Sequence, residues 1–254
     1  MAFVEVQVAK QVARVVLDRP PLNVIDLDSA RTFAQALEEV RNRPGLSLLL
    51  LEARGKAFCA GVDVRDHLPD RGEAMLHEFH RICKLLLEME CVVAAAVQGP
   101  ALGGGCELVQ MCDLAIASSR AVFGQPEIKL GVFPPVAAVA LPRIVPAMLA
   151  RDMLLTGRIL SAEEARQAGL VGRVAAETEF PAAVEKLVGE IGALSASSVR
   201  LTKCAIRAAG NRIDPAEIDA AERFYVKELM NTPDAIEGLK AFLEKRLPAW
   251  THGE

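Results

Sequence analysis

Aromatic and histidine residues are scarce in this sequence. Phe, Tyr and Trp together make up 4% of the 254 residues, and only four histidines occur, none with the spacing of a zinc-binding pair. The chain has no basic run and no interleaving of basic with aromatic residues, and its formal net charge is -4. These absences disfavour a metal site and a nucleic-acid partner.

Long hydrophobic runs and paired cysteines are also missing. No apolar run reaches the roughly 18 residues that a bilayer-spanning helix needs. The first residues, 1–6, alternate as a strand does and do not resemble a signal peptide. The six cysteines include no CxxC pair, and most of them lie in apolar segments. We therefore expect a cytoplasmic protein with reduced core thiols and no membrane partner.

Apolar residues, by contrast, are abundant enough for a large core. Hydrophobic residues make up 52% of the chain and charged residues 24%, which argues against disorder. Strands alternate with helices up to about residue 135, and the remainder is mainly helical, which indicates an α/β architecture. Asp28 is a candidate cap for the first helix. The expected strands are 3–8, 12–18, 47–52, 92–97 and 113–117, and the longest expected helices are 72–89, 180–194, 196–209 and 214–230.

One stretch combines a strand, a glycine run and a carboxylate. An apolar segment at 92–97 leads into Gly103-Gly104-Gly105, and Glu107 follows within the first turn of an expected helix. Glycines at such a junction let the backbone approach a ligand closely, and the start of the helix adds partial positive charge. The stretch therefore suits a developing anion beside a potential acid or base. Tight packing of helix on strand explains the same glycines equally well.

Two further loops follow expected strands. They are residues 58–63 and residues 123–128, and the second carries Glu127. Together the three loops offer backbone amides for an oxyanion hole and a pair of carboxylates for proton transfer. Spacing alone does not show that the loops converge, and a glutamate in an exposed loop is common without any function.

Taken in order, these motifs resemble the enoyl-CoA hydratase/isomerase (crotonase) family. The resemblance covers nearly the whole chain, and several motifs in register are far more specific than any one of them. The matching segments are Ala101-Leu102-Gly103-Gly104-Gly105-Cys106-Glu107, Phe58-Cys59-Ala60-Gly61-Val62-Asp63, Gly124-Gln125-Pro126-Glu127, Leu155-Thr156-Gly157, residues 165–171 and residues 237–246.

The resemblance implies both a fold and a reaction class. The fold would be an α/β spiral of ββα units over residues 1–195, followed by a helical trimerisation region over residues 196–254. The protein would be a homotrimer or a hexamer built as a dimer of trimers. Its partner would be an acyl-CoA substrate, its chemistry that of a hydro-lyase, and it would need no cofactor, because CoA is part of the substrate.

The resemblance also implies roles for individual residues. The thioester oxygen would lie in an oxyanion hole made by the backbone amides of Ala60 and Gly104. Glu107 and Glu127 match the two catalytic glutamates of the hydratases. Glu107 would activate water as a base, and Glu127 would hold the water and supply the proton. The presence of both carboxylates favours hydration over isomerisation.

Binding of CoA is expected at two places. The nucleotide would lie along Ala60, Gly61, Val62 and Asp63, mainly through backbone contacts. At the C-terminal end, Phe242 and Lys245 match positions that reach CoA. A lysine near a phosphate is physically sensible, and a solvated surface lysine is the alternative.

The segment after Glu127 departs from the common hydratase pattern. Pro134 and Pro135 stand where ordinary enoyl-CoA hydratases have a Gly-rich segment, and Pro135 has no amide to position water. We therefore assign both prolines to the acyl pocket. With residues 21–26 and 63–67, this variant resembles the cyclohexa-1,5-diene-1-carbonyl-CoA hydratases of anaerobic benzoyl-CoA degradation. Such an enzyme adds water 1,4 across a conjugated cyclic dienoyl thioester and yields 6-hydroxycyclohex-1-ene-1-carbonyl-CoA.

Some interpretations stay open at this point. A general 2-enoyl-CoA hydratase of fatty-acid β-oxidation and a non-catalytic crotonase-fold scaffold are the alternative functions. Asp66 and His67 are expected to be surface-loop residues, with the border of the acyl pocket as the alternative. Asp26 is either a turn residue or a pocket edge, and the sequence does not decide between them.

Overall fold

The computed structural model describes residues 3–210 and 213–251, so Met1 and Ala2 of the expected first strand lie outside the described residues. A six-stranded sheet in the order β1-β2-β3-β4-β6-β9 forms its centre. β1 and β2 form an antiparallel hairpin, and every later neighbour in this sheet pairs in parallel. The strands are β1 (Val4–Ala9), β2 (Val12–Leu17), β3 (Leu48–Ala53), β4 (Val92–Val97), β6 (Leu114–Ser118) and β9 (Arg173–Ala175).

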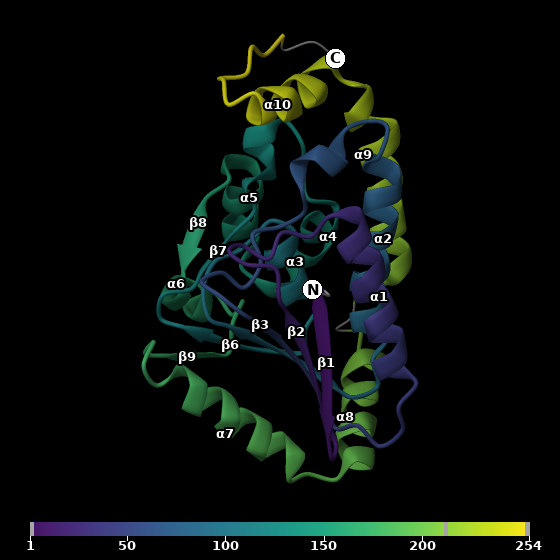
Figure 1. The fold of residues 1–254 in the computed structure, drawn as a ribbon, viewed down its shortest axis with the longest axis vertical. Helices are drawn as coiled ribbons and strands as arrows, with labels where there is room; N and C mark the ends of the chain where they lie inside the picture. Colours follow the sequence, from purple (N-terminus) through teal and green to yellow (C-terminus); the bar gives the residue numbers. More distant parts are fainter. Residues whose placement is uncertain (1–2, 211–212, 252–254) are drawn as a thin grey trace.

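Helices cover both faces of this sheet, which explains its uninterrupted apolar strands. Alternate residues of β3 point to opposite faces, so Leu49 and Leu51 join the main core while Leu48 and Leu50 pack with α7 (Phe180–Gly192). The main core lies on the side of α1 (Leu27–Arg41) and α2 (Gly72–Glu88), and Figure 1 shows α7 across the sheet from them.

A second, three-stranded sheet was not expected from the sequence. It contains β5 (Ala101–Leu102), β7 (Val122–Gly124) and β8 (Ile159–Ser161) in the order β5-β7-β8. Each strand has only two or three residues, too few to show an alternating pattern. The pairing of β5 with β7 brings the glycine run and the segment before Glu127 side by side.

The helices predicted at 72–89, 180–194, 196–209 and 214–230 begin and end close to those bounds. The side chains of Ser161 and Thr232 cap the starts of two other helices. Asp28 as a cap is wrong: α1 starts at Leu27, and the Asp26 side chain accepts a hydrogen bond from the Ser29 amide. The other helices are α3 (Gly104–Gln110), α4 (Pro135–Ile144), α5 (Ala147–Thr156), α6 (Ala162–Gln167), α8 (Ala196–Ala208), α9 (Pro215–Lys227) and α10 (Pro233–Leu243), with 3₁₀ turns η1 (Val64–His67), η2 (Pro126–Leu130) and η3 (Leu229–Asn231).

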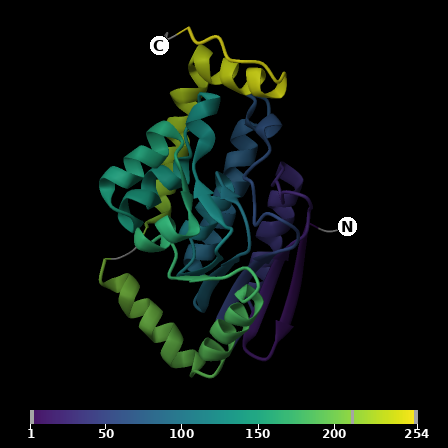
Figure 2. The same cartoon turned by 90° about the vertical axis from the view of Figure 1, so that its left-hand side faces the viewer.

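The C-terminal helices return to the core of the same chain. α9 packs against α2 and α4, where Lys84 pairs with Asp219 and Arg143 pairs with Glu217. α10 lies at one end of the molecule, and α7 and α8 lie at the other (Figure 2). Within the described residues, no helix has both the length and the apolar character that a membrane crossing requires. The return of α9 matters because it closes one wall of the cavity described next.

Candidate active site

The glycine run fits two close approaches that a side chain would prevent. Gly103 has φ 52 and ψ -127, and a Cβ there would lie 2.5 Å from Glu127 Oε1. A Cβ on Gly105 would lie 2.0 Å from the carbonyl oxygen of Cys59. Gly105 therefore serves tight packing, whereas Gly103 makes room for a carboxylate. The glycine run therefore serves both purposes considered above: close approach to a functional group at Gly103 and tight packing at Gly105.

Glu107 and Glu127 face one cavity of about 410 Å³. Glu107 comes from α3 and is only 4% exposed, and its Oε1 accepts a hydrogen bond of 2.8 Å from the Ala137 amide. Glu127 comes from η2, and its Oε2 is buried without a hydrogen-bond partner among the described residues. Two carboxyl groups 20 residues apart in the sequence thus converge, which spacing alone did not show.

Burial sets the protonation of this pair. Burial raises the pKa of Glu107 to about 7, although hydrogen bonds from the amides of Ala137 and Val136 act to lower the pKa. Burial raises the pKa of Glu127 well above its usual range, and the nearby Glu107 charge raises it further. Burial and mutual repulsion therefore favour a single negative charge on the pair near neutral pH, with one of the two carboxyl groups keeping its proton. A base and an acid then lie in the same cavity.

The proline pair starts α4 and lines this cavity. Pro134 is the N-cap of α4 and Pro135 its first residue, a position where proline loses no helical hydrogen bond. The first amides that α4 offers are those of Val136 and Ala137, and both act on Glu107. The prolines therefore orient the Glu107 carboxylate through the helix start while they supply only apolar surface themselves.

Ala60 does not fit the predicted role of oxyanion donor. Its amide donates a hydrogen bond of 2.9 Å to the carbonyl oxygen of Leu22, so it is occupied. The loop around Ala60 pairs with residues 22–25, and the Asp63 amide also donates a hydrogen bond in this pairing. The amide of Val62 has no partner among the described residues. The Ala60 assignment is therefore wrong, and the free donor in this loop lies two residues later.

Val62 and Gly104 form the donor pair that the geometry supports. Gly104 is the first residue of α3, and in the described part of the chain its amide has no acceptor. A Cβ on Gly104 would lie 3.0 Å from Val62 Cγ2, and one on Gly61 would lie 3.5 Å from the Gly104 nitrogen. The two residues are thus neighbours, and both line the cavity that holds the glutamates.

The residues assigned to CoA divide between the cavity wall and its surroundings. Ala60, Gly61 and Val62 line the cavity, and so does Phe242, which is 54% exposed. The Asp63 side chain instead caps η1 and pairs with Arg65. Lys245 is exposed just after α10.

Asp66 and His67 are not the surface-loop residues that the sequence suggested. Asp66 is buried, where it accepts a 2.8 Å hydrogen bond from the Leu27 amide and pairs with Arg71 at 2.9 Å. It thereby ties η1 to the start of α1. His67 lines the cavity, and burial lowers its pKa. Asp26 is the helix cap described above and pairs with Arg19 at 2.6 Å, so it is a structural residue.

Two buried residues of the cavity wall, His80 and Tyr225, were not predicted from the sequence. His80 lies on α2, with Nδ1 2.5 Å from the Glu222 carboxylate of α9. Tyr225, also on α9, lies with its hydroxyl buried. For His80 a signal existed, because it follows Leu76 by four residues on the apolar stripe of α2. The sequence near Tyr225 carries no comparable sign.

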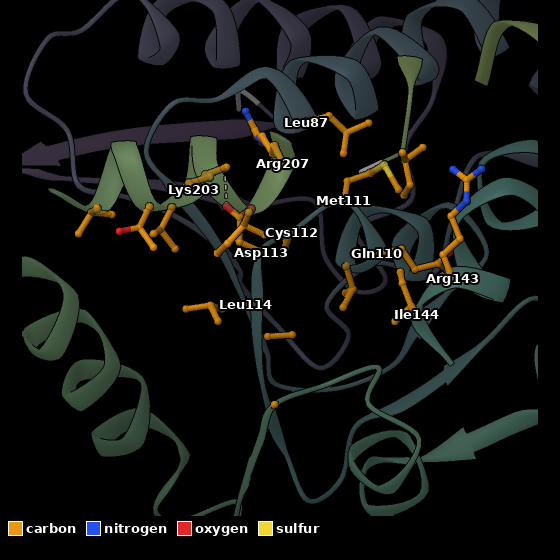
Figure 3. A pocket seen from close by; sticks show the side chains of 18 of the residues that line it. Leu87, Gln110, Met111, Cys112, Asp113, Leu114, Arg143, Ile144, Lys203 and Arg207 are labelled. Carbon is orange, nitrogen blue, oxygen red and sulfur yellow. Dashed lines mark hydrogen bonds and ion pairs between the residues drawn. The ribbon is translucent and has the colours of Figure 1, made fainter. Parts of the chain in front are cut away.

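A larger hollow lies between α8 and the core, with a volume of about 1460 Å³. Its charged groups are engaged within the chain: Lys203 pairs with Asp113 (Figure 3) and donates to the carbonyl oxygen of Cys91. Arg207 donates to the carbonyl oxygen of Met89. This hollow therefore lacks the converging amides and carboxylates of the smaller cavity, which we take as the candidate active site.

Comparisons with known proteins agree with this architecture. The family model described as enoyl-CoA hydratase/isomerase matches residues 7–253. A cyclohexa-1,5-dienecarbonyl-CoA hydratase of Thauera aromatica is 39% identical over 93% of this chain and 92% of its own length. A crotonyl-CoA hydratase of Syntrophomonas wolfei is 35% identical over 97% of both chains. The crystal structure of an enoyl-CoA hydratase from Mycobacterium avium subsp. paratuberculosis superposes with a TM-score of 0.86 at 29% identity, covering 98% of this chain and 99% of the other.

Proposed function

The chain belongs to the enoyl-CoA hydratase/isomerase family, and from this premise we propose that it is a hydro-lyase that adds water to a conjugated enoyl thioester of coenzyme A. The single observation that carries the proposal is the cavity in which two glutamates, whose pKa values burial raises, face two backbone amides without acceptors among the described residues. Such a set can bind a developing enolate and move two protons, which is what hydration of an enoyl thioester needs.

In the proposed reaction, the thioester oxygen accepts hydrogen bonds from the amides of Val62 and Gly104. Glu107 takes a proton from water, and the resulting hydroxide bonds to the β carbon. The electron pair of the double bond moves toward the thioester oxygen, where each donor is worth roughly 3–4 kcal/mol by analogy with other oxyanion holes. Glu127 then gives its proton to carbon, and proton exchange between the glutamates and solvent restores the starting state.

For the acyl group we propose cyclohexa-1,5-diene-1-carbonyl-CoA, with 6-hydroxycyclohex-1-ene-1-carbonyl-CoA as product in anaerobic benzoyl-CoA degradation. The Thauera aromatica relative supports this choice, and so does the apolar wall that includes Pro134, Pro135 and Phe133. Hydroxide adds to the β carbon, the charge spreads through the dienolate, and the proton goes to the γ carbon. Relative to simple hydration, only the destination of the proton changes.

A general 2-enoyl-CoA hydratase is the second candidate, because the Syntrophomonas wolfei relative carries the name crotonyl-CoA hydratase. Steady-state assays of the purified enzyme with crotonyl-CoA and with the cyclic dienoyl-CoA separate the two. We expect the larger kcat/KM for the cyclic substrate. A larger value for crotonyl-CoA would reject the assignment of the acyl group and keep the hydratase assignment.

A non-catalytic scaffold fits the cavity less well. Burying two carboxyl groups without a cationic partner destabilises a fold, and perturbed pKa values of this kind are typical of functional sites. Absence of any water addition to either acyl-CoA, at enzyme concentrations that detect slow turnover, would favour the scaffold.

For the assembly we propose a homotrimer, or a hexamer formed by two trimers, with CoA bound near Val62 and Phe242 and its phosphates near Lys245. Several large apolar side chains are exposed on one chain, as expected of surfaces that subunits cover: Met148, Leu155, Leu201, Ile206 and Leu247. Sedimentation equilibrium tests this proposal. A monomer at micromolar concentration would contradict it.

A further inference from the structure

Three buried polar atoms in the wall of the candidate active site have no hydrogen-bond partner among the described residues. They are His80 Nε2, Glu127 Oε2 and Tyr225 Oη. Buried polar groups are nearly always paired, so each such atom calls for an explanation. Glu127 Oε2 is explained by its place in the proposed reaction. Tyr225 Oη is not, because no step described above uses it.

Tyr225 is held rigidly in the cavity wall. Its side chain is 1% exposed, and its ring meets the ring of Phe133 edge to face, with centroids 5.3 Å apart. The helix that carries it, α9, is fixed to α4 by the ion pair of Arg143 with Glu217. Its hydroxyl therefore has one defined location at the cavity and little freedom to find a partner elsewhere.

The electrostatic surroundings keep this hydroxyl protonated. Burial raises the pKa of Tyr225 above its usual value, and the charges of Glu127 and Glu107 raise it further. Tyr225 lines the same cavity as both glutamates. Tyr225 is thus a neutral hydrogen-bond donor throughout the pH range of activity, and it neither gains nor loses a proton during the reaction.

The proline pair leaves this part of the cavity wall without a free backbone donor. Pro134 and Pro135 line it, and Pro135 has no amide hydrogen. The amide of Ala137 is directed to Glu107 instead. A water molecule that donates to an ionised carboxylate can accept one hydrogen bond from the carboxyl group that keeps its proton, and its oxygen has room for a second donor, because ordered waters in proteins make about three hydrogen bonds. Tyr225 Oη is an unpartnered hydroxyl in the wall of the same cavity.

Resting on the proposed hydration, we infer that Tyr225 is a further catalytic residue whose hydroxyl donates a hydrogen bond to the attacking water between Glu107 and Glu127. In the forward direction this bond orients the water while one of its O–H bonds breaks, its proton passes to Glu107 and its oxygen bonds to the β carbon. In the reverse direction the same bond stabilises the departing hydroxide. Tyr225 keeps its own proton in both directions.

The test is Tyr225→Phe, which removes one oxygen atom and leaves the ring in place. We expect kcat to fall about 10- to 100-fold, as when a single donor is removed from a reacting oxygen, while KM for the acyl-CoA stays within about twofold. The thermal unfolding midpoint should stay equal or rise, because the variant no longer buries an unpaired hydroxyl. Thr156→Val, which removes an exposed hydroxyl bonded to the Asp152 carbonyl oxygen, is the control and should leave kcat unchanged.

The possible outcomes separate this inference from the proposed function. If the wild-type enzyme hydrates acyl-CoA and Tyr225→Phe has a kcat within about twofold of it, the inference is wrong and the hydratase assignment stands. A fall in the unfolding midpoint that accompanies the loss of activity also overturns it, because the hydroxyl would then be structural. If the wild-type enzyme hydrates neither substrate, the proposed function itself fails.

Discussion

Gly103 offers the sharpest test of the proposed site, because a single methyl group added there would displace the carboxyl group of Glu127, the proposed proton donor. A Cβ at this position would lie 2.5 Å from Glu127 Oε1, closer than van der Waals contact allows. In Gly103→Ala the carboxyl group must therefore move away. The backbone there, at φ 52 and ψ -127, is also one that only glycine adopts without strain.

These two effects have different expected magnitudes. Strain at such a backbone position destabilises the folded state by about 1–3 kcal/mol, which a fold of this size tolerates. Displacement of Glu127 should lower kcat at least ~100-fold, the scale for loss of a positioned acid or base. The assay is hydration followed at the enoyl thioester absorbance, with the unfolding free energy measured on the same samples.

Gly45→Ala is the matched control. Gly45 has φ 76, so the substitution strains the backbone there too, but nothing lies within 4 Å of the added Cβ. We expect Gly45→Ala to lower stability by about 1–2 kcal/mol and to keep wild-type kcat. If Gly103→Ala is as active as Gly45→Ala, then contact between Gly103 and Glu127 does not position a catalytic group, and our assignment of Glu127 is refuted.

Four further predictions concern the same region. Glu107→Gln and Glu127→Gln should each lower kcat at least roughly 100-fold with folding intact, and an unchanged kcat in either would remove that residue from the mechanism. The value of kcat/KM should decline as the pH falls below about 7, because Glu107, with its pKa raised to about 7, must be ionised to act as base; a flat profile from pH 6 to 8 would contradict this. The pKa of Glu107 is higher in the folded state than in the unfolded state, so the folded state binds more protons between about pH 4.5 and 7. The unfolding free energy should therefore fall as the pH rises through that window, and it should fall less in Glu107→Gln. Asp66→Asn should destabilise the fold by about 1–3 kcal/mol through loss of the pair with Arg71 while kcat changes little, and a selective loss of kcat would instead place Asp66 in the site.

The error at Ala60 shows what a motif leaves undetermined. Residues 60–62 of the loop from residue 58 to 63 line the same cavity as Gly104. Which amide remains free depends on how the loop pairs with residues 22–25, a segment more than 30 residues earlier in the chain. A shift by two residues in that pairing would exchange the roles of Ala60 and Val62. The residues of the loop itself contain no information on this register.

His80 and Tyr225 illustrate a second limit. Their helices were predicted with nearly correct bounds, but neither residue belongs to the motifs that carry the family resemblance. Tyr225 lines the same cavity as the glutamates because α9 returns to pack on α2 and α4. Contacts between segments more than 100 residues apart are a property of packing, and periodicity in the sequence says which face of a helix is buried but not what it is buried against.

What the sequence determined by itself is the family, the strands of the central sheet up to β6 and the long helices, and it singled out both glutamates and the proline pair as candidates. Each of these rests on local signals: apolar periodicity, helix caps, and motifs in which a few adjacent residues must occur together. What only the tertiary structure decided is the convergence of Glu107 with Glu127, the free amide of Val62 and the presence of Tyr225 in the cavity. The physical reason is that a pKa, an unpaired donor and a cavity wall all depend on burial, and burial is set by the whole fold.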